Sequence, residues 1–351
     1  MAAYIFRRIL LMIPTLFGIM LITFTVTQFV PGGPVERMLA LMQTHSFGGS
    51  EVGVSTTSNL YQGAKGLDEE RREQLKELYG FDKPPVERFL IMMKNYILFD
   101  FGESYYHHQS VVALVISKLP VSMSLGLWTF LIVYCTCIPL GISKAVHDGS
   151  RFDVITSSAI LVGYAIPGFV LAILLIVLFG GGSFLNIFPL RGLISDNWSE
   201  MSTIGKILDY LWHMVLPIIS STVGSLAVMT LLTKNSFLEE IRKQYVLTAR
   251  AKGLSENRVL YRHIFRNAII PIITGFPGSF ITAFFTGSLL IETIFSLDGM
   301  GLLAYESILN RDYPVVLGTL YFFTMIGLVS RLLSDLSYVL VDPRITFESM
   351  E

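Results

Sequence analysis

The chain has 351 residues, of which 52% are hydrophobic and 15% are charged, and its mean hydropathy is +0.59. Soluble domains carry about 25% charged residues, so this composition argues against the two soluble domains that the length alone would allow. A net charge of −1 gives no general attraction to nucleic acid. We therefore expect an all-α protein that crosses a membrane several times and has no nucleic-acid partner.

Residues 1–30 are predicted to hold an N-terminal tail and the first transmembrane helix. Arg7 and Arg8 precede an apolar run of 22 residues, from Ile9 to Val30. The apolar core of a signal peptide is about 7–15 residues long and is followed by a cleavage site with small residues, which is missing here. We therefore interpret the run as a span that stays in the protein.

Residues 31–118 are predicted to form one large segment outside the membrane. Residues 45–66 are rich in Gly, Ser and Thr and indicate a flexible loop. Residues 67–80 have the pattern of a helix that stops at Gly80. An amphipathic helix of about 14 residues is then predicted from Val86; it is too short to span. We expect it to pack on the protein or lie at the outer boundary, with a substrate contact as the alternative.

Six apolar blocks are long enough to cross a bilayer, because about 20 helical residues cover about 30 Å of hydrocarbon. They are Ile9–Phe29, Val121–Ser143, Val154–Phe179, Trp212–Thr233, Ile269–Ile294 and Val315–Leu336. Gly, Ser and Thr within them favour close packing of helices in lipid. We predict one bundle, with five spans in residues 119–345 and a C-terminal tail at 346–351.

Basic residues concentrate on one set of flanks. The predicted loop 234–268 holds eight Lys or Arg, whereas the opposite short loops have few basic residues, balanced or outnumbered by acidic ones. The other basic residues on the first set are Arg7, Arg8, Lys144, Arg151 and Arg344. Short cytoplasmic loops are enriched in Lys and Arg, so both chain termini are predicted to be cytoplasmic.

A search for catalytic, metal-ligating and cofactor-binding motifs finds none. The sequence has no G-x-x-x-x-G-K-[ST] phosphate loop, no H-E-x-x-H and no G-x-S-x-G. Cys135 and Cys137 are two residues apart in an apolar block, which puts them on different helix faces. We therefore expect buried free thiols, and no catalytic, metal or cofactor residue is assigned.

Three ionisable residues within the spans are candidates for a structural or gating role, since such residues are costly in a membrane. Glu292 lies near the outer end of the fifth span. Arg331 and Asp335 lie near the inner end of the sixth, four residues apart, so they can pair on one helix face. None of them lies near the midplane, where a proton-coupled transporter usually needs its acids.

The loop 234–268 is predicted to form two helices separated at Gly253. Ser236 and Glu239 have the spacing of a capping box for the first helix, and Gly253 suits a left-handed stop. Ser255 is a suitable N-cap for the second helix, with Glu256 at the positive end of its dipole.

The second helix is predicted to have an apolar side and a basic side. Arg258, Arg262 and Arg266 share the basic side. Contact with anionic lipid headgroups would explain these arginines. It would not explain a helix break flanked by the small residues Ala249 and Ala251, which favours a docking element for another protein.

The loop YVLTARAKGLSENRVLYRHIFRNAIIP resembles the cytoplasmic loop of permease subunits in the dipeptide/oligopeptide class of ABC importers. Ala249 and Gly253 match the second Ala and the Gly of the family's E-A-A…G motif, whereas Leu247 and Thr248 replace its Glu and first Ala. Further matching stretches are RRILLMIPTLFGIMLITF, FDFGES, GYAIPGF, GSLLIETIFSLDGMGLL, RDYPVV and VDPRI. The PGGP at 31–34 and the long, flexible insert 40–66 are typical of the microcin C/oligopeptide permease branch of Gram-negative bacteria.

The resemblance implies a type I ABC importer permease in the bacterial inner membrane, with six transmembrane helices and a large first periplasmic segment. Its implied partners are a homologous second permease, a periplasmic peptide-binding protein and two ABC ATPases or one fused ATPase, which bind ATP and Mg. In this family the loop docks the ATPase. The implied coupling residues are Thr248, Ala249, Arg250, Ala251, Lys252, Gly253, Ser255, Arg258, Arg262 and Arg266.

Two other functions stay open from the sequence. One is a secondary peptide transporter driven by protons, which would transport without ATP. The other is a membrane anchor whose loop binds a soluble complex without any transport.

Overall fold

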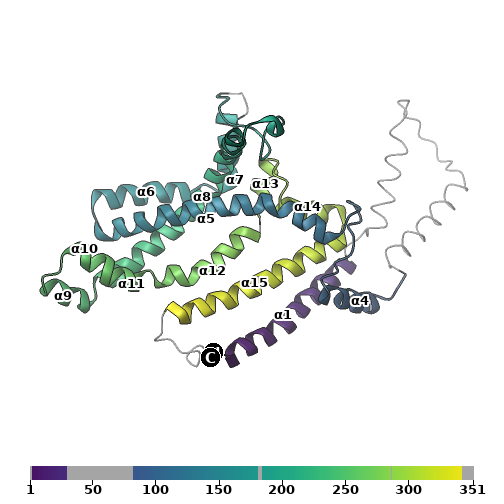
Figure 1. Ribbon diagram of the computed structural model, residues 1–351, viewed down its shortest axis with the longest axis horizontal. Helices are drawn as coiled ribbons and strands as arrows, with labels where there is room; N and C mark the ends of the chain where they lie inside the picture. The colour runs from purple at the N-terminus through teal and green to yellow at the C-terminus, as the bar shows by residue number, and fades with distance from the viewer. Residues whose placement is uncertain (1, 30–81, 181–183, 286, 342–351) are drawn as a thin grey trace, which may run out of the picture. The chain divides into compact units, whose positions relative to one another are not determined.

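A computed structural model describes residues 2–29, 82–180, 184–285 and 287–341, and the described chain is helical, without a named strand (Figure 1). The predicted loop at 45–66 and helix at 67–80 lie outside the described residues. The α-helices are α1 (Ala2–Phe29), α4 (Pro85–Ile97), α5 (Val111–Val146), α6 (Arg151–Ala165), α7 (Gly168–Leu175), α8 (Thr203–Ile241), α9 (Gln244–Ala251), α10 (Glu256–Arg258), α11 (Phe265–Ala268), α12 (Ile270–Phe285), α13 (Leu289–Ile294), α14 (Met300–Asn310) and α15 (Tyr313–Val341). Short segments η1 (Ile176–Gly180), η2 (Trp198–Glu200) and η3 (Val259–Ile264) complete the order.

The chain divides into two compact units. The first consists of Lys118–Leu303 with the described residues of Met1–Leu10 and Met325–Glu351. The second consists of the described part of Leu11–Ser117 and of Ala304–Thr324.

Five helical stretches of the described chain are long and apolar enough to cross a membrane, or six if one bent pair counts as a span. The five are Tyr4–Phe29, Val111–Val146, Thr203–Ile241, Ile270–Ile294 and Tyr313–Leu340. They agree with five of the six predicted spans, and the all-helical prediction is confirmed. Several helices extend well beyond the predicted blocks, because a hydropathy pattern ends where polar residues begin but a helix does not have to.

The predicted third span is bent. Residues Arg151–Ala165 and Gly168–Gly180 meet at an angle of 89°. Ile166 has an extended backbone (φ −90°, ψ 117°) directly before Pro167. A proline disfavours helical geometry in the residue that precedes it, so the predicted span Val154–Phe179 is broken at this point into two helices.

The predicted fifth span is also interrupted. Helix α12 ends at Phe285, Gly287 has a positive φ of 62°, and α13 begins at Leu289 after an extended Ser288. Positive φ values are readily reached by glycine and seldom by other residues. Hydropathy did not reveal this break, because small residues such as Gly287 and Ser288 also occur within continuous membrane helices.

In the second unit, the amphipathic helix predicted after Pro85 is α4, and its apolar face is packed. Phe89 and Tyr96 are buried. The ring of Phe89 lies 5.5 Å from that of Phe17 and 5.3 Å from that of Phe24, both on α1. The expectation that this helix packs on the protein is confirmed, and burial raises the pKa of the Tyr96 hydroxyl.

Candidate functional site

The loop that the sequence analysis singled out follows directly from the longest helix of the described chain. Helix α8 runs for 39 residues, from Thr203 to Ile241, and includes Ser236 in its interior. The capping box predicted at Ser236 is therefore wrong, because an N-cap residue needs a non-helical backbone. The chain instead turns at Arg242 and Lys243, and α9 begins at Gln244.

Glu240 holds this turn together. Its carboxylate accepts hydrogen bonds from the ammonium of Lys243 and from the hydroxyl of Tyr245, the latter at 2.7 Å. The hydrogen bond to Glu240 raises the pKa of Lys243. A side chain in the last turn of α8 thus fixes the first residues of α9.

The predicted helix stop at Gly253 is confirmed. Its φ is +79°, and its N–H donates to the carbonyl of Arg250 at 2.9 Å. A Cβ at Gly253 would have no atom within 4 Å. The glycine is therefore required by the backbone conformation and not by a lack of space.

Ser255 stands at the N-cap of the next helix, as predicted, with an extended backbone but no hydrogen bond from its side chain. The guanidinium of Arg250 donates to both carboxylate oxygens of Glu256, at 2.9 and 3.0 Å. This bidentate ion pair spans the Gly253 turn. From the sequence, Glu256 was expected only to stabilise the positive end of the helix dipole. The second helix then continues to Ala268 through α10, η3 and α11.

The inner faces of both loop helices pack on the ends of α5 and α8. A buried cluster joins Val246 and Ala249 of α9 with Phe237 of α8. Its other buried members are Ile142, Ala145, Val259, Ile264 and Ala268. Ala249 is 7% exposed, so its small size is accounted for by packing inside this chain; the sequence analysis had assigned it to contact with another protein.

The outer faces are open. Thr248, Ala251 and Lys252 are exposed on α9 and its C-terminal end, and the Leu247 side chain is 54% exposed. In the second helix Arg258, Arg262 and Arg266 are exposed while Ile264 and Ala268 are buried, which confirms the predicted basic and apolar sides.

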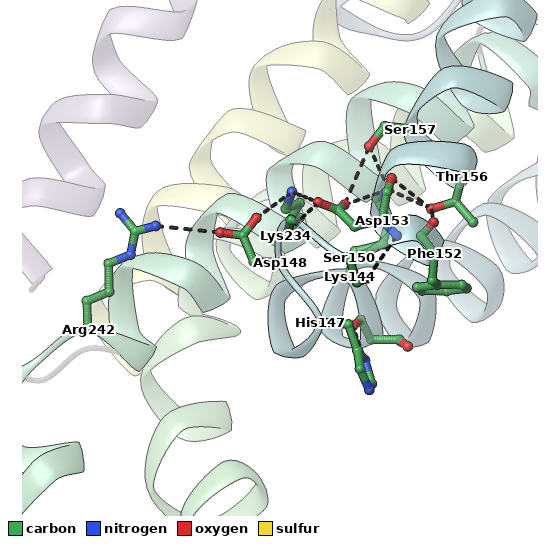
Figure 2. Close-up of polar contacts among 12 residues, drawn as sticks. Lys144, His147, Asp148, Ser150, Phe152, Asp153, Thr156, Ser157, Lys234 and Arg242 are labelled. Carbon is green, nitrogen blue, oxygen red and sulfur yellow. Dashed lines mark hydrogen bonds and ion pairs between the residues drawn. The ribbon is translucent and has the colours of Figure 1, made fainter.

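Next to this loop lies a group of five charged side chains, three of them largely buried, that was not predicted from the sequence (Figure 2). Lys144, in the last turn of α5, is fully buried. Its ammonium lies 3.0 Å from a carboxylate oxygen of Asp153 and donates to the Asp153 carbonyl at 2.9 Å. It also donates to the hydroxyls of Thr156 and Ser157, both at 2.7 Å. All these partners lie in the first two turns of α6.

The same Asp153 carboxylate reaches α8. Its second oxygen lies 2.7 Å from the ammonium of Lys234, which also pairs with Asp148 at 2.9 Å. Asp148 in turn lies 3.6 Å from the guanidinium of Arg242, the residue that caps α8 before the loop (Figure 2). We call these five residues the ion chain.

One local signal pointed to Asp153. Ser150 is the N-cap of α6 and accepts a hydrogen bond from the Asp153 N–H at 3.2 Å. The spacing S-x-x-D is that of a capping box. Lys144 and Arg151 served only in the count of basic residues that predicts membrane orientation, so the contact between Lys144 and Asp153 was not predicted.

Glu292 is fully buried at the interruption of the fifth span. Its carboxylate accepts hydrogen bonds from Ser122 Oγ at 2.9 Å, from the Ser288 N–H at 3.0 Å and from the Leu302 N–H at 2.9 Å. Ser122 Oγ in turn accepts from the Met300 N–H at 2.8 Å. Glu292 and Ser122 therefore satisfy donors in the first turn of α14, which have no partner within their own helix.

The predicted pair between Arg331 and Asp335 is wrong. Asp335 lies 2.9 Å from the guanidinium of Arg8 and accepts a hydrogen bond from the Tyr4 hydroxyl at 3.0 Å. Arg331 is exposed, and no ion pair joins it to Asp335 in the described chain. The partner of Asp335 comes from α1, so spacing within α15 alone could not predict it.

The thiols of Cys135 and Cys137 are free; Cys137 is buried and Cys135 is exposed, which corrects the expectation that both are buried. Across the described ranges, no three His, Cys, Asp or Glu side chains come together as a metal site would require.

The sequence of the chain is similar to those of known transport proteins. The family model for the inner membrane component of binding-protein-dependent transport systems matches residues 137–347. The chain is 58% identical over 360 residues to the peptidoglycan transport system permease protein YejB of Agrobacterium fabrum, covering 99% of both chains. It is 53% identical to the inner membrane ABC transporter permease protein YejB of Escherichia coli, covering 99% of this chain and 100% of the relative.

More distant similarity extends over the whole chain in one relative and over part of it in a solved structure. The chain is 32% identical to the oligopeptide transport system permease protein AppB of Bacillus subtilis, covering 99% of this chain and 100% of the relative. A chain of the inward-facing MetNI methionine ABC transporter matches 66% of this chain and 97% of its own length, with a TM-score of 0.50 and 14% identity. At this identity the structural match concerns the fold alone.

Proposed function

Because the chain belongs to the family of inner membrane components of binding-protein-dependent transport systems, we propose that it forms the transmembrane pathway of an ATP-driven importer for oligopeptides or peptide-like compounds of the microcin C type. The names of its relatives support this substrate class, since they refer to peptidoglycan, oligopeptide and dipeptide transport. In this proposal the chain is not an enzyme. Two ABC ATPases, or one fused ATPase, bind ATP and Mg and hydrolyse the nucleotide.

The ATPase docks on Thr248–Gly253 and on the exposed side of the helix that follows Ser255. The observation that carries this assignment is the fixed position of α9. Val246 and Ala249 seat it on Phe237, while Thr248, Ala251 and Lys252 stay exposed. A helix that is packed on one side and open on the other can transmit a push to the helix on which it rests. The exposed Arg258, Arg262 and Arg266 supply positive charge beside this surface.

A second, homologous permease completes the pathway. The span Ile270–Ile294 supports this part of the proposal, because only 6% of its most apolar part is buried inside the chain, against 11% for the span in α1 and 33% for those in α5, α8 and α15. An exposed span of this kind needs either lipid or another subunit on its open sides. Both termini are cytoplasmic, in line with the basic loop 234–268, and the outer segments receive the periplasmic peptide-binding protein.

Uptake in reconstituted vesicles tests the function. The chain is co-purified with its second permease and ATPases, inserted into liposomes and supplied with binding protein and a labelled peptide. We expect uptake that requires ATP and persists when a protonophore removes any proton gradient. Uptake driven by a proton gradient without ATP would instead identify a secondary transporter. ATPase binding without any peptide flux would identify a membrane anchor.

Two substitutions at Gly253 test the docking site. Val at a positive φ is strongly disfavoured, whereas Asn tolerates this conformation. We expect Gly253→Val to lower peptide uptake at least fivefold at equal amounts of inserted protein, and Gly253→Asn to retain most of it. Because a Cβ at this position has open space around it, the two variants differ in backbone preference and not in crowding. Equal uptake by both would contradict the docking assignment.

A further inference from the structure

We propose that the ion chain positions the docking helix α9 relative to α5 and α6, so that a force on α9 moves α5, α6 and α8 together. This inference rests on the proposed function, since it gives the five charged residues a part in coupling ATP hydrolysis to transport. They are Lys144, Asp148, Asp153, Lys234 and Arg242, and they are positioning residues that touch neither nucleotide nor peptide.

The ion chain is continuous: each of its five side chains contacts the next. The contacts run from the last turn of α5 through the first turn of α6 to α8: Lys144 to Asp153 at 3.0 Å and Asp153 to Lys234 at 2.7 Å (Figure 2). They continue through Asp148 to Arg242. Arg242 is the residue at which α8 ends, and Lys243 begins the turn into α9. Glu240, which fixes that turn, lies in the last turn of α8.

Three members of the ion chain are largely buried. The side chains of Lys144, Asp153 and Lys234 are 0%, 7% and 14% exposed. A lysine without exposed surface does not reach a lipid headgroup, so membrane attraction does not account for Lys144. Buried ion pairs add little net stability compared with apolar side chains of the same size, because the charges lose their hydration. Their use here is better explained by the fixed geometry that they impose.

The contacts of the ion chain are directional, unlike apolar packing. The apolar cluster around Phe237 also joins these helices, but the hydrophobic effect has no directional preference and allows small slides and rotations. Lys144 is different, since its ammonium has four oxygen partners: two of Asp153 and the hydroxyls of Thr156 and Ser157. Rotation or sliding of α6 against α5 would break several of these contacts at once. The ion chain therefore specifies one register for the three helices.

Distances between helices test the inference without any measurement of transport. Cys135 and Cys137 are first replaced by Ser and Ala, and spin labels are placed at the exposed Arg151 of α6 and Gln244 of α9, which lies outside the proposed docking residues, in the full-length chain of the assembled importer. Electron spin resonance then gives the distribution of label distances. We expect Asp153→Asn to broaden or shift this distribution and the control Lys118→Met to leave it unchanged. Lys118 is also an ion-paired lysine of α5, but it pairs with Asp298 at the other end of that helix.

Coupling in the reconstituted importer gives the second readout. For Asp153→Asn we expect at least a fivefold fall in peptide transported per ATP hydrolysed, while ATP hydrolysis itself falls less than twofold. If transport and hydrolysis fall in parallel with the amount of folded complex, the ion chain serves stability alone and the inference is wrong. An unchanged ratio with an unchanged distance distribution would overturn it as well.

A milder variant covers the case in which Asp153→Asn does not assemble. Asp148→Asn removes a half-exposed member of the ion chain and leaves the contact between Lys144 and Asp153 in place. We expect it to shift the same two readouts in the same direction by smaller amounts, and no shift in either would overturn the inference. If the unsubstituted importer shows no ATP-driven uptake, the proposed function fails, and the label distances still decide whether the ion chain fixes α9.

Discussion

Glu292 illustrates how one acidic side chain can organise several backbone segments. It is enclosed by glycines: a Cβ on Gly287 would lie 2.6 Å from its Oε1, and a Cβ on Gly299 would lie 2.6 Å from its Cδ. The carboxylate takes the space that side chains would occupy there and accepts hydrogen bonds from the N–H groups of Ser288 and Leu302. The breaks before α13 and α14 therefore depend on one residue.

Replacing Glu292 with Leu should destabilise the protein. The buried N–H groups of Ser288 and Leu302 would lose their acceptor, at about 1–3 kcal/mol for each unsatisfied group. Glu292→Gln keeps one carbonyl acceptor and should cost less. Thermal unfolding of the detergent-solubilised protein, followed by size-exclusion chromatography, measures the difference. Glu306→Leu is the control: this glutamate is exposed, and the expected change is within about 0.5 kcal/mol. Equal losses for Glu292→Leu and Glu306→Leu would contradict the assigned role.

Helices α5 and α8 approach each other at Gly141. A Cβ at this position would lie 2.5 Å from the Cβ of Thr233 and 2.9 Å from the carbonyl oxygen of Thr230. Small residues at helix contacts permit such an approach in membrane proteins. This contact lies one turn before Lys144 and close to Lys234 along the two helices, so it brings the two lysines of the ion chain within reach of Asp153.

Gly141→Ala should force α5 and α8 apart. Overpacking of this kind costs about 1–3 kcal/mol, and the ion chain should loosen with it. Thermal unfolding and the label distances between residues 151 and 244 measure the two effects. Gly224→Ala on α8 is the matched control, since a Cβ there meets no atom within 4 Å, and the better helix propensity of Ala should leave stability equal or higher. Unchanged stability of Gly141→Ala would contradict the close approach.

For the whole molecule, the membrane orientation decides which surfaces meet the ATPase and which meet the binding protein. The pattern of basic residues predicts cytoplasmic termini and a cytoplasmic loop 234–268. Residues 184–202 would then lie on the outer side.

Single cysteines test this orientation. In a background without Cys135 and Cys137, a membrane-impermeant maleimide should label a cysteine at Asp196 in intact spheroplasts. It should label a cysteine at His147, in the turn between α5 and α6, only after the membrane has been permeabilised. Both positions are exposed and lie outside the proposed docking residues, so accessibility within the protein does not distinguish them. Labelling of His147→Cys in intact spheroplasts would reverse the orientation and remove α9 from the reach of a cytoplasmic ATPase.

The sequence by itself determined the apolar blocks that become the spans, the helix stop at Gly253 and the basic side of Arg258, Arg262 and Arg266. These features depend on hydropathy, periodicity and the conformational preference of single residues, all of which are local. The resemblance of the loop to permeases came from the same local pattern. The break at Gly287 and the bend at Pro167 were not predicted, because Gly and Pro also occur within continuous membrane helices.

Only the tertiary structure decided which charges meet. Asp335 accepts a hydrogen bond from Tyr4, a residue 331 positions away, in place of the expected ion pair with Arg331. Lys144 and Lys234 lie on different helices and share Asp153 on a third. An ion pair depends on the distance between two side chains, and here that distance is set by how separate helices pack. Spacing along the chain reports only on neighbours within one helix, so it could not reveal either contact.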